Sequence, residues 1–109
     1  MNLLARVAGF ILVLSCFLIT ACIENSATIT VTNDTDGTHV VKFDGHGSKT
    51  LAAYQVYEWD IDWETQPHED TKHEFSVYVD GLYCTKYHVW DGDDDREFST
   101  YYCVTYGSD

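Results

Sequence analysis

Apolar and polar residues alternate with period two over most of the chain beyond residue 26. Ala27, Ile29 and Val31 alternate with three threonines, and segments rich in Asn, Asp and Gly follow at 33–37 and 44–47. Such alternation places every second side chain on one face, as in a β-strand that buries one side. No stretch of useful length has a helical period. The pattern therefore predicts an all-β domain with short strands and glycine-containing turns.

The clearest alternation covers residues 54–64. One face carries large apolar side chains: Tyr57, Trp59, Ile61 and Trp63. The other face carries four carboxylates: Glu58, Asp60, Asp62 and Glu64. A shift of one residue would bury all four carboxylates, so the register of this strand is strongly specified.

A hairpin follows, because Phe75, Val77 and Val79 alternate up to Asp80-Gly81, a dipeptide typical of tight β-turns. We expect a three-residue loop, with Gly81 left-handed in a bulge and Val77 opposite Tyr83. The alternative two-residue loop would set Val77 opposite Cys84 and turn Tyr83 outward.

The last two strands are predicted to form a second hairpin. If Cys84 and Cys103 lie opposite each other in an antiparallel pair, the same register pairs Trp90 with Glu97. Residues 91–96 then form the loop, where the turn-forming residues are. This arrangement places a disulfide on the outer face of the sheet. The whole pattern predicts a small antiparallel β-sandwich or open barrel of six to seven strands with one disulfide.

The start of the chain has a different character. Arg6 precedes an almost wholly apolar run at 7–19, which is too short for a comfortable membrane span and typical of a signal peptide. The run ends in Ile19-Thr20-Ala21-Cys22, which resembles the lipobox of bacterial membrane lipoproteins. This resemblance implies cleavage before Cys22 and acylation of that residue with palmitate or similar chains.

The same resemblance implies a location and a division of the chain. Residues 1–21 would be the signal peptide, 22–26 a lipidated tether and 27–109 the β-sandwich domain. The lipid would anchor the protein in the cell membrane or the outer membrane, with the domain in the periplasm or at the cell surface. Loss of Cys16 and lipidation of Cys22 leave Cys84 and Cys103 as a pair, which an oxidising compartment favours as a disulfide.

Charge narrows the choice of partners. After loss of the signal peptide, five Lys and Arg side chains remain against eighteen Asp and Glu, a formal charge of −13. Nucleic acid and anionic lipid headgroups would be repelled. A row of Lys or Arg on a partner protein would suit the four carboxylates of residues 58–64. The alternative is a solvated face that lysines on a neighbouring strand partly neutralise.

Two segments are candidate metal sites. Asp91, Asp93 and Asp95, with Glu97 beyond them, resemble the opening of a calcium loop. Arg96 stands where such a loop has glycine, and a tyrosine stands where it has its bidentate glutamate. The second segment contains His68 and His73 among acidic residues and is a candidate zinc or copper site. The remaining histidines, His39, His46 and His88, are predicted to be isolated surface residues.

The sequence has no nucleophile elbow, phosphate loop or pair of histidines on a helix, and we predict that the protein is not an enzyme. The first functional hypothesis is a membrane-anchored binding module that needs no cofactor and docks a basic protein on its acidic face. The alternative is a cation-binding or structural envelope lipoprotein.

Overall fold

The computed structural model describes residues 22–106, so the predicted signal peptide and residues 107–109 lie outside the described part. The described chain forms seven strands and one short helix. In chain order these are β1 (Ile23–Thr32), β2 (His39–Phe43), β3 (Gly47–Leu51), β4 (Val56–Thr65), β5 (His73–Val79), β6 (Leu82–Val89), β7 (Arg96–Ser99) and α2 (Thr100–Tyr106).

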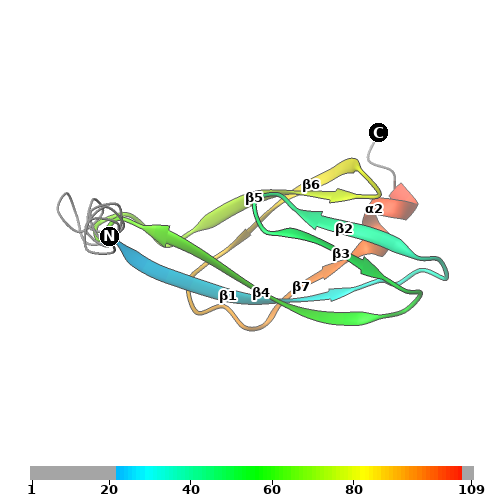
Figure 1. Cartoon of the computed structure of the whole chain (residues 1–109), viewed down its shortest axis with the longest axis horizontal. Coiled ribbons are helices and arrows are strands. Elements are labelled where there is room, and N and C mark those ends of the chain that lie inside the picture. The colour runs from blue at the N-terminus through cyan, green and yellow to red at the C-terminus, as the bar shows by residue number, and fades with distance from the viewer. Residues whose placement is uncertain (1–21, 107–109) are drawn as a thin grey trace, which may run out of the picture.

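The strands form two sheets that pack face to face as a small sandwich (Figure 1), which confirms the predicted fold class. One sheet has the order β4-β1-β7 and the other has the order β3-β2-β5-β6. All neighbouring strands are antiparallel except β1 and β7, which run parallel. Within the described residues, no helix combines the length and the apolar character needed to cross a membrane.

Phe43 of β2 is the centre of the core between the two sheets. Its ring stacks on Trp59 of β4 at a centroid distance of 4.1 Å and lies 6.1 Å from Phe98 of β7. Within its own sheet it lies 4.9 Å from Phe75 of β5. Aromatic pairs of this kind contribute about 0.5–1.5 kcal/mol each beyond the burial of their surface. Phe43 therefore joins three strands other than its own.

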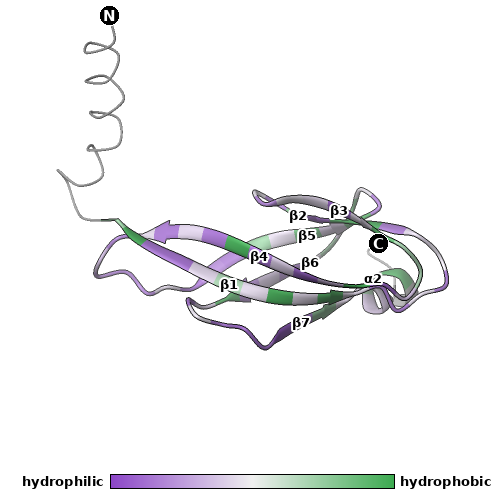
Figure 2. Ribbon diagram, turned by 60° about the horizontal axis from the view of Figure 1, so that its bottom comes forward, coloured by the Kyte–Doolittle hydropathy of each residue, from purple (hydrophilic) through white to green (hydrophobic). Residues whose placement is uncertain are grey.

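Strand β4 has the register that its sequence predicts. Trp59 and Ile61 are buried and the flanking Tyr57 and Trp63 are half-buried, while all four carboxylates of 58–64 are exposed. Figure 2 shows hydrophilic and hydrophobic positions alternating along β1 and β4. Strand β4 has this register because its side chains alternate with period two, and only one register buries the aromatic face.

The predicted tether at 22–26 is wrong, because residues 23–26 form the beginning of β1. Ile23 pairs with Thr65 and Asn25 pairs with Trp63 across the β1–β4 ladder. Asn25 is only 2% exposed. Strand β4 continues to Thr65, and its last residues would leave their backbone groups unpaired without this extension of β1.

The turn between β5 and β6 is also not the predicted one. Val79 pairs with Leu82, so the loop has two residues, and both Asp80 and Gly81 have positive φ (54° and 83°). This conformation suits the twist of a hairpin better than a three-residue loop. The bulge occurs further on, at Cys84.

That bulge changes which residue lies opposite Val77. Val77 pairs with Thr85, and Tyr83 pairs with Tyr78 on the outer side, where Tyr83 is 46% exposed. The expected burial of Tyr83 is therefore wrong. The extra residue is accommodated within the strand rather than in the turn.

The Cys84–Cys103 disulfide is confirmed, but the predicted β6–β7 hairpin is wrong. Strand β7 crosses to the other sheet and pairs with β1, and Cys103 lies in α2. A disulfide requires only a short Cα–Cα distance, here 5.4 Å, and a helix meets this condition as well as a strand does. The expected outward position is wrong too, because Cys103 is 4% exposed and belongs to the core.

Candidate binding face

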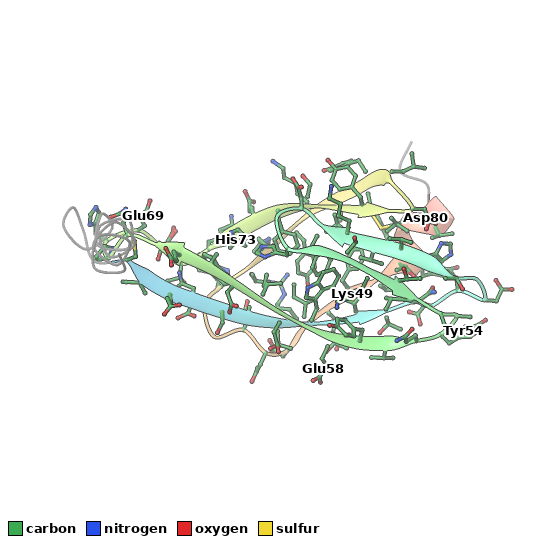
Figure 3. All side chains as sticks on the ribbon, viewed as in Figure 1. Lys49, Tyr54, Glu58, Glu69, His73 and Asp80 are labelled. Carbon is green, nitrogen blue, oxygen red and sulfur yellow. A yellow bond between two sulfur atoms is a disulfide. The ribbon has the colours of Figure 1, made fainter. Side chains whose placement is uncertain are left out.

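The outer side of the β4-β1-β7 sheet is strongly acidic. The ladders place Glu64 opposite Glu24, while Glu58 and Glu97 lie on either side of Thr30. We call this surface the acidic face; its exposed carboxylates are Glu24, Glu58, Asp60, Asp62, Glu64 and Glu97. Figure 3 shows Glu58 projecting away from the sandwich.

Small hydroxyl residues, rather than lysines, separate these carboxylates. Asp62, Asp60 and Glu58 lie opposite Ser26, Thr28 and Thr30 in that order. The Thr28 hydroxyl donates a 2.6 Å hydrogen bond to Asp60. The alternative of neutralisation by lysines on the neighbouring strand therefore does not hold for β4 and β1.

The basic side chains belong to other parts of the described chain. Lys42 and Lys49 lie on β2 and β3 and are placed over the rings of Tyr78 and Tyr57. Arg96 lies on β7, but its guanidinium is 4.8 Å from the centre of the Tyr87 ring. Within the described residues, no ion pair includes a carboxylate of the acidic face.

The acidic face costs stability. Alternate residues of one strand are about 7 Å apart, and two carboxylates at that distance in water repel by about 0.6 kcal/mol. The directly opposed pair Glu24 and Glu64 adds a further unfavourable cross-strand contact. Within the described residues, no ion pair relieves this repulsion.

A hollow of about 380 Å³ lies at one end of the acidic face. It is lined by Glu24, Asn25, Ser26, Asp62, Trp63 and Glu64. The Nδ2 of Asn25 donates 3.0 Å to the hydroxyl of Thr65, whereas its buried Oδ1 has no partner among the described residues. Three carboxylates around a hollow of this size suit a Lys or Arg side chain.

The structure does not assemble the predicted calcium site. Asp91 accepts a 2.9 Å hydrogen bond from the Ser26 N–H, and Asp93 accepts one of 2.8 Å from the Trp90 N–H. Glu97 belongs to the acidic face, and Asp95 is exposed in the loop just before β7. Within the described residues, no group of three or more His, Cys, Asp or Glu side chains is placed to hold a metal ion.

His73 has a different neighbour from the one predicted. Its Nε2 lies 2.8 Å from the Nε2 of His46, which belongs to the turn after β2 and was expected to be isolated. His39 is not isolated either, because its Nδ1 lies 2.6 Å from Asp80. His88, on β6, is exposed as predicted. Sequence reasoning missed these contacts because each joins residues at least 27 positions apart.

Burial lowers the pKa of both paired histidines. For His46 the desolvation outweighs the nearby carboxylates of Asp62 and Asp44, which act in the opposite direction. For His73 the desolvation is reinforced by His46 itself, since two imidazolium ions would repel. Both rings are therefore neutral at neutral pH.

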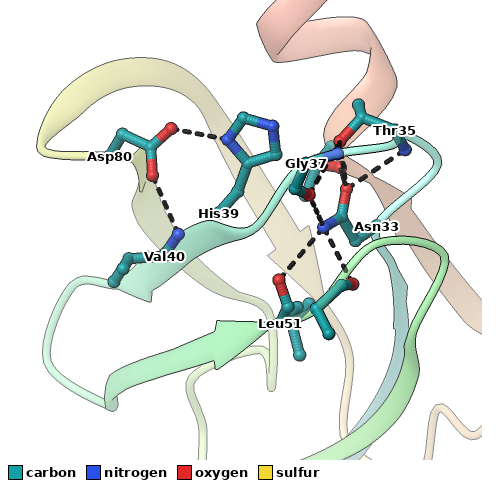
Figure 4. Close-up of polar contacts among 9 residues, drawn as sticks. Asn33, Thr35, Gly37, His39, Val40, Leu51 and Asp80 are labelled. Carbon is teal, nitrogen blue, oxygen red and sulfur yellow. Dashed lines mark hydrogen bonds and ion pairs between the residues drawn. The ribbon is translucent and has the colours of Figure 1, made fainter.

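Asn33 is a structural residue that the sequence pattern describes only as part of a turn. Its side chain is fully buried and connects the end of β1 with three other parts of the chain (Figure 4). Nδ2 donates to the carbonyls of Gly37 and Leu51, and Oδ1 accepts from the hydroxyls of Thr35 and Thr100. Asn33 therefore ties together the loops at one end of the sandwich, and the hollow lies at the other end.

Cys22, the predicted lipidation site, directly precedes β1. In the structure of the whole chain Cys22 is disulfide-bonded. Acylation of its sulfur and this disulfide exclude each other, so the lipid-anchored protein that the lipobox resemblance implies would be a form without this bond.

No family model matches the chain, and no curated protein or solved structure matches it either.

Proposed function

We propose that this protein is a membrane-anchored lipoprotein that binds a basic protein partner on its acidic face. The observation that carries the proposal is the separation of charge: six exposed carboxylates share one side of a sheet, and no ion pair among the described residues neutralises them. A sheet holds the backbone of these residues at regular spacing, so the sheet itself loses little conformational entropy when a matching row of cations binds.

The net charge also speeds the encounter between the two proteins. A net charge of −12 on the whole chain attracts a cationic protein over a distance of about one Debye length, roughly 8 Å at physiological salt. Once the partner is bound, the hollow beside Asp62 and Glu64 takes up one Lys or Arg side chain. Binding should therefore weaken steeply as the salt concentration rises.

The lipid anchor would place the acidic face near the membrane. The lipobox resemblance assigns the acyl chains to Cys22, and β1 begins at the next residue. Glu24 and Glu64 would then lie close to the bilayer surface, with Glu58 further away along the sheet. Two or three acyl chains would hold the protein almost irreversibly, since each buried methylene adds about 0.8 kcal/mol.

A charge-neutralised variant tests the binding face. In this face variant the four carboxylates of β4 become E58Q, D60N, D62N and E64Q. An equally neutralised control variant carries exchanges at exposed positions off the sheet: D36N, D70N, D94N and D95N. Both lose four charges, so the pair separates the position of the charges from their number.

An oligo-lysine peptide serves as the probe, and thermal melts show that each variant is folded. At about 0.5 kcal/mol for each exposed ion pair, the face variant should bind the peptide at least about tenfold more weakly. The control variant should stay close to the wild type. Equal weakening of both variants, or no weakening of either, would contradict the proposed face.

Mass spectrometry tests the anchor separately. The mature protein should begin at Cys22 and carry the mass of its acyl chains, and the variant C22S should leave the membrane fraction. An unmodified Cys22 in mature protein would contradict the anchor without affecting the binding face.

A further inference from the structure

Strand β4 forms an edge of its sheet. In the order β4-β1-β7 it has a neighbour on one side only, and it pairs with β1 along its full ten residues (Figure 2). The other edge strands are shorter or interrupted, because β3 has five residues, β7 has four and β6 carries the bulge at Cys84. Strand β4 therefore presents the longest regular edge in the described part of the chain.

The backbone groups of β1 show which residues of β4 face this open edge. The N–H of Thr28 donates a 2.8 Å hydrogen bond to the carbonyl of Asp93. The carbonyl of Ser26 accepts a hydrogen bond of 2.8 Å from the N–H of Gly92. Both partners belong to the loop before β7, on the side of β1 away from β4. Because the sides alternate along a strand, the odd-numbered residues of β1 are the ones that bond to β4.

The register transfers this alternation to β4. Each odd-numbered residue of β1 lies opposite an odd-numbered residue of β4, such as Ile29 opposite Trp59. The N–H of Asn33 donates 2.9 Å to the carbonyl of Gln55, which continues the same odd-numbered series beyond the ladder. The even-numbered residues of β4 therefore direct their N–H and C=O groups to the open edge. They include all four carboxylate residues of this strand: Glu58, Asp60, Asp62 and Glu64.

These edge-facing groups have no partner within the described residues. Neither a strand nor a loop of the described chain bonds to the N–H or C=O of the four carboxylate residues. Open strand edges of this kind bind extended segments of other chains, which continue the ladder. Many proteins protect such an edge with proline, a bulge or a charge that points inward, whereas β4 has none of these.

The side chains along the edge select the strand that can add there. In an antiparallel pair, directly opposed residues point their side chains to the same face of the sheet. Opposite each carboxylate a lysine or arginine is favourable, and another carboxylate is unfavourable, which disfavours a second copy of β4 as the occupant. The intervening residues of an added strand would lie beside the half-buried Tyr57 and Trp63, a position that suits threonine or valine.

We propose that the basic partner binds through an extended segment with Lys or Arg at alternate positions, which adds to the open edge of β4 as an antiparallel strand. This inference rests on the proposed function and deepens it, because it states the form of the partner. Each cationic residue then exchanges two backbone hydrogen bonds with the carboxylate residue opposite and pairs with its side chain. The alternation gives specificity, since a shift of one residue turns the cations away from the acidic face.

The competing explanation is docking by charge alone, in which cationic side chains meet the carboxylates and the edge stays open. Two peptides of equal charge separate the explanations. The parent probe is an acetylated and amidated heptapeptide in which four lysines alternate with three threonines. One derivative carries N-methyl groups on the two inner lysines, and the control derivative carries them on two threonines.

N-methylation removes a backbone donor without changing the charge. In the antiparallel arrangement the N–H groups of the lysines face β4, whereas those of the threonines face solvent. The lysine-methylated peptide should bind the wild-type protein at least about tenfold more weakly than the threonine-methylated control, since it loses two hydrogen bonds. The control should bind much like the parent peptide.

Amide hydrogen exchange of the wild-type protein is an independent readout. Without peptide, the amides of the four carboxylate residues should exchange fast, whereas those of Trp59 and Ile61 are protected by β1. The parent peptide should slow exchange at the four edge-facing amides. Docking by charge alone would leave their exchange unchanged.

The outcomes separate a failure of this inference from a failure of the proposed function. Equal binding of the two methylated peptides, or unchanged exchange at the edge-facing amides, would overturn the added strand and leave the acidic face in place. Weaker binding of the threonine-methylated peptide instead would overturn the antiparallel direction. No binding of the parent peptide would overturn both proposals. A wild-type dimer that already protects these amides would make a second copy the occupant and overturn the basic segment.

Discussion

The exchange N33A is expected to destabilise the protein severely, although Asn33 lies between a strand and a turn. The side chain is 0% exposed, and Nδ2 donates to three carbonyls: Gly37 at 2.7 Å, Ala52 at 3.0 Å and Leu51 at 3.1 Å. Its Oδ1 accepts from Thr100 at 3.0 Å and twice from Thr35, at 2.7 and 3.2 Å. Alanine would remove all of these bonds at once.

The magnitude follows from the partners that stay buried. Thr35 and the loop carbonyls can be reached by water after the exchange, but the Leu51 carbonyl and the Thr100 hydroxyl lie in buried residues. An unsatisfied buried polar group costs about 1–3 kcal/mol, so these two predict a loss of about 4 kcal/mol. That is a large part of the stability of a small domain.

Urea denaturation measures this loss, and N25A provides a matched control. Asn25 is almost as deeply buried, at 2% exposed, but its Nδ2 makes only two bonds, of 3.0 and 3.4 Å. Its Oδ1 makes none within the described residues. We expect N25A to cost about 1 kcal/mol.

The comparison would refute the reasoning if N33A lost no more free energy of unfolding than N25A. Both variants should keep the wild-type dependence of this free energy on urea, because neither changes the surface exposed on unfolding.

Two further predictions concern stability. The double variant C84S/C103S should lose about 3 kcal/mol of unfolding free energy in a urea titration, since the disulfide closes a loop between residues 19 positions apart; a wild-type midpoint in this variant would contradict it. Burial raises the pKa of Asp80, but bonds from the Val40 N–H and from His39 outweigh it and lower the pKa overall. The ionised carboxylate therefore stabilises the fold above the ordinary pKa of Asp, and this contribution disappears as the pH falls through the lower folded value. D80N should be less stable than the wild type at pH 7 and should approach it below about pH 4; a difference that is independent of pH would contradict this prediction.

The candidate binding face was largely predictable. The alternation of residues 54–64 leaves one register that buries Trp59 and Ile61, and the same register exposes the carboxylates. The sequence could not show that the neighbouring strand adds Glu24 and hydroxyl residues rather than lysines. Those neighbours depend on the pairing of β1 with β4, and β4 begins 24 residues after the end of β1, beyond the reach of a local pattern.

The histidine pair could not be predicted, because its members lie on separate segments and have no shared pattern. His46 and His73 meet because the β2–β3 turn and the start of β5 reach the same edge of the sandwich. Nor does the local sequence reveal that Asn33 is buried, since Asn followed by Asp is typical of an exposed turn.

By itself, the sequence determined the all-β class, the buried sides of β1, β2, β4 and β5, and the cysteine pair. These properties follow from side-chain period and composition, which are local or nearly so. Only the tertiary structure decided that β7 leaves β6 and pairs with β1, and that Thr100–Tyr106 is helical although its residues favour strands. The physical reason is that a strand pairs wherever a sheet edge and a matching apolar face are available, and this depends on the whole fold. The short helix forms there because it buries Thr100 against Asn33 and brings Cys103 to Cys84.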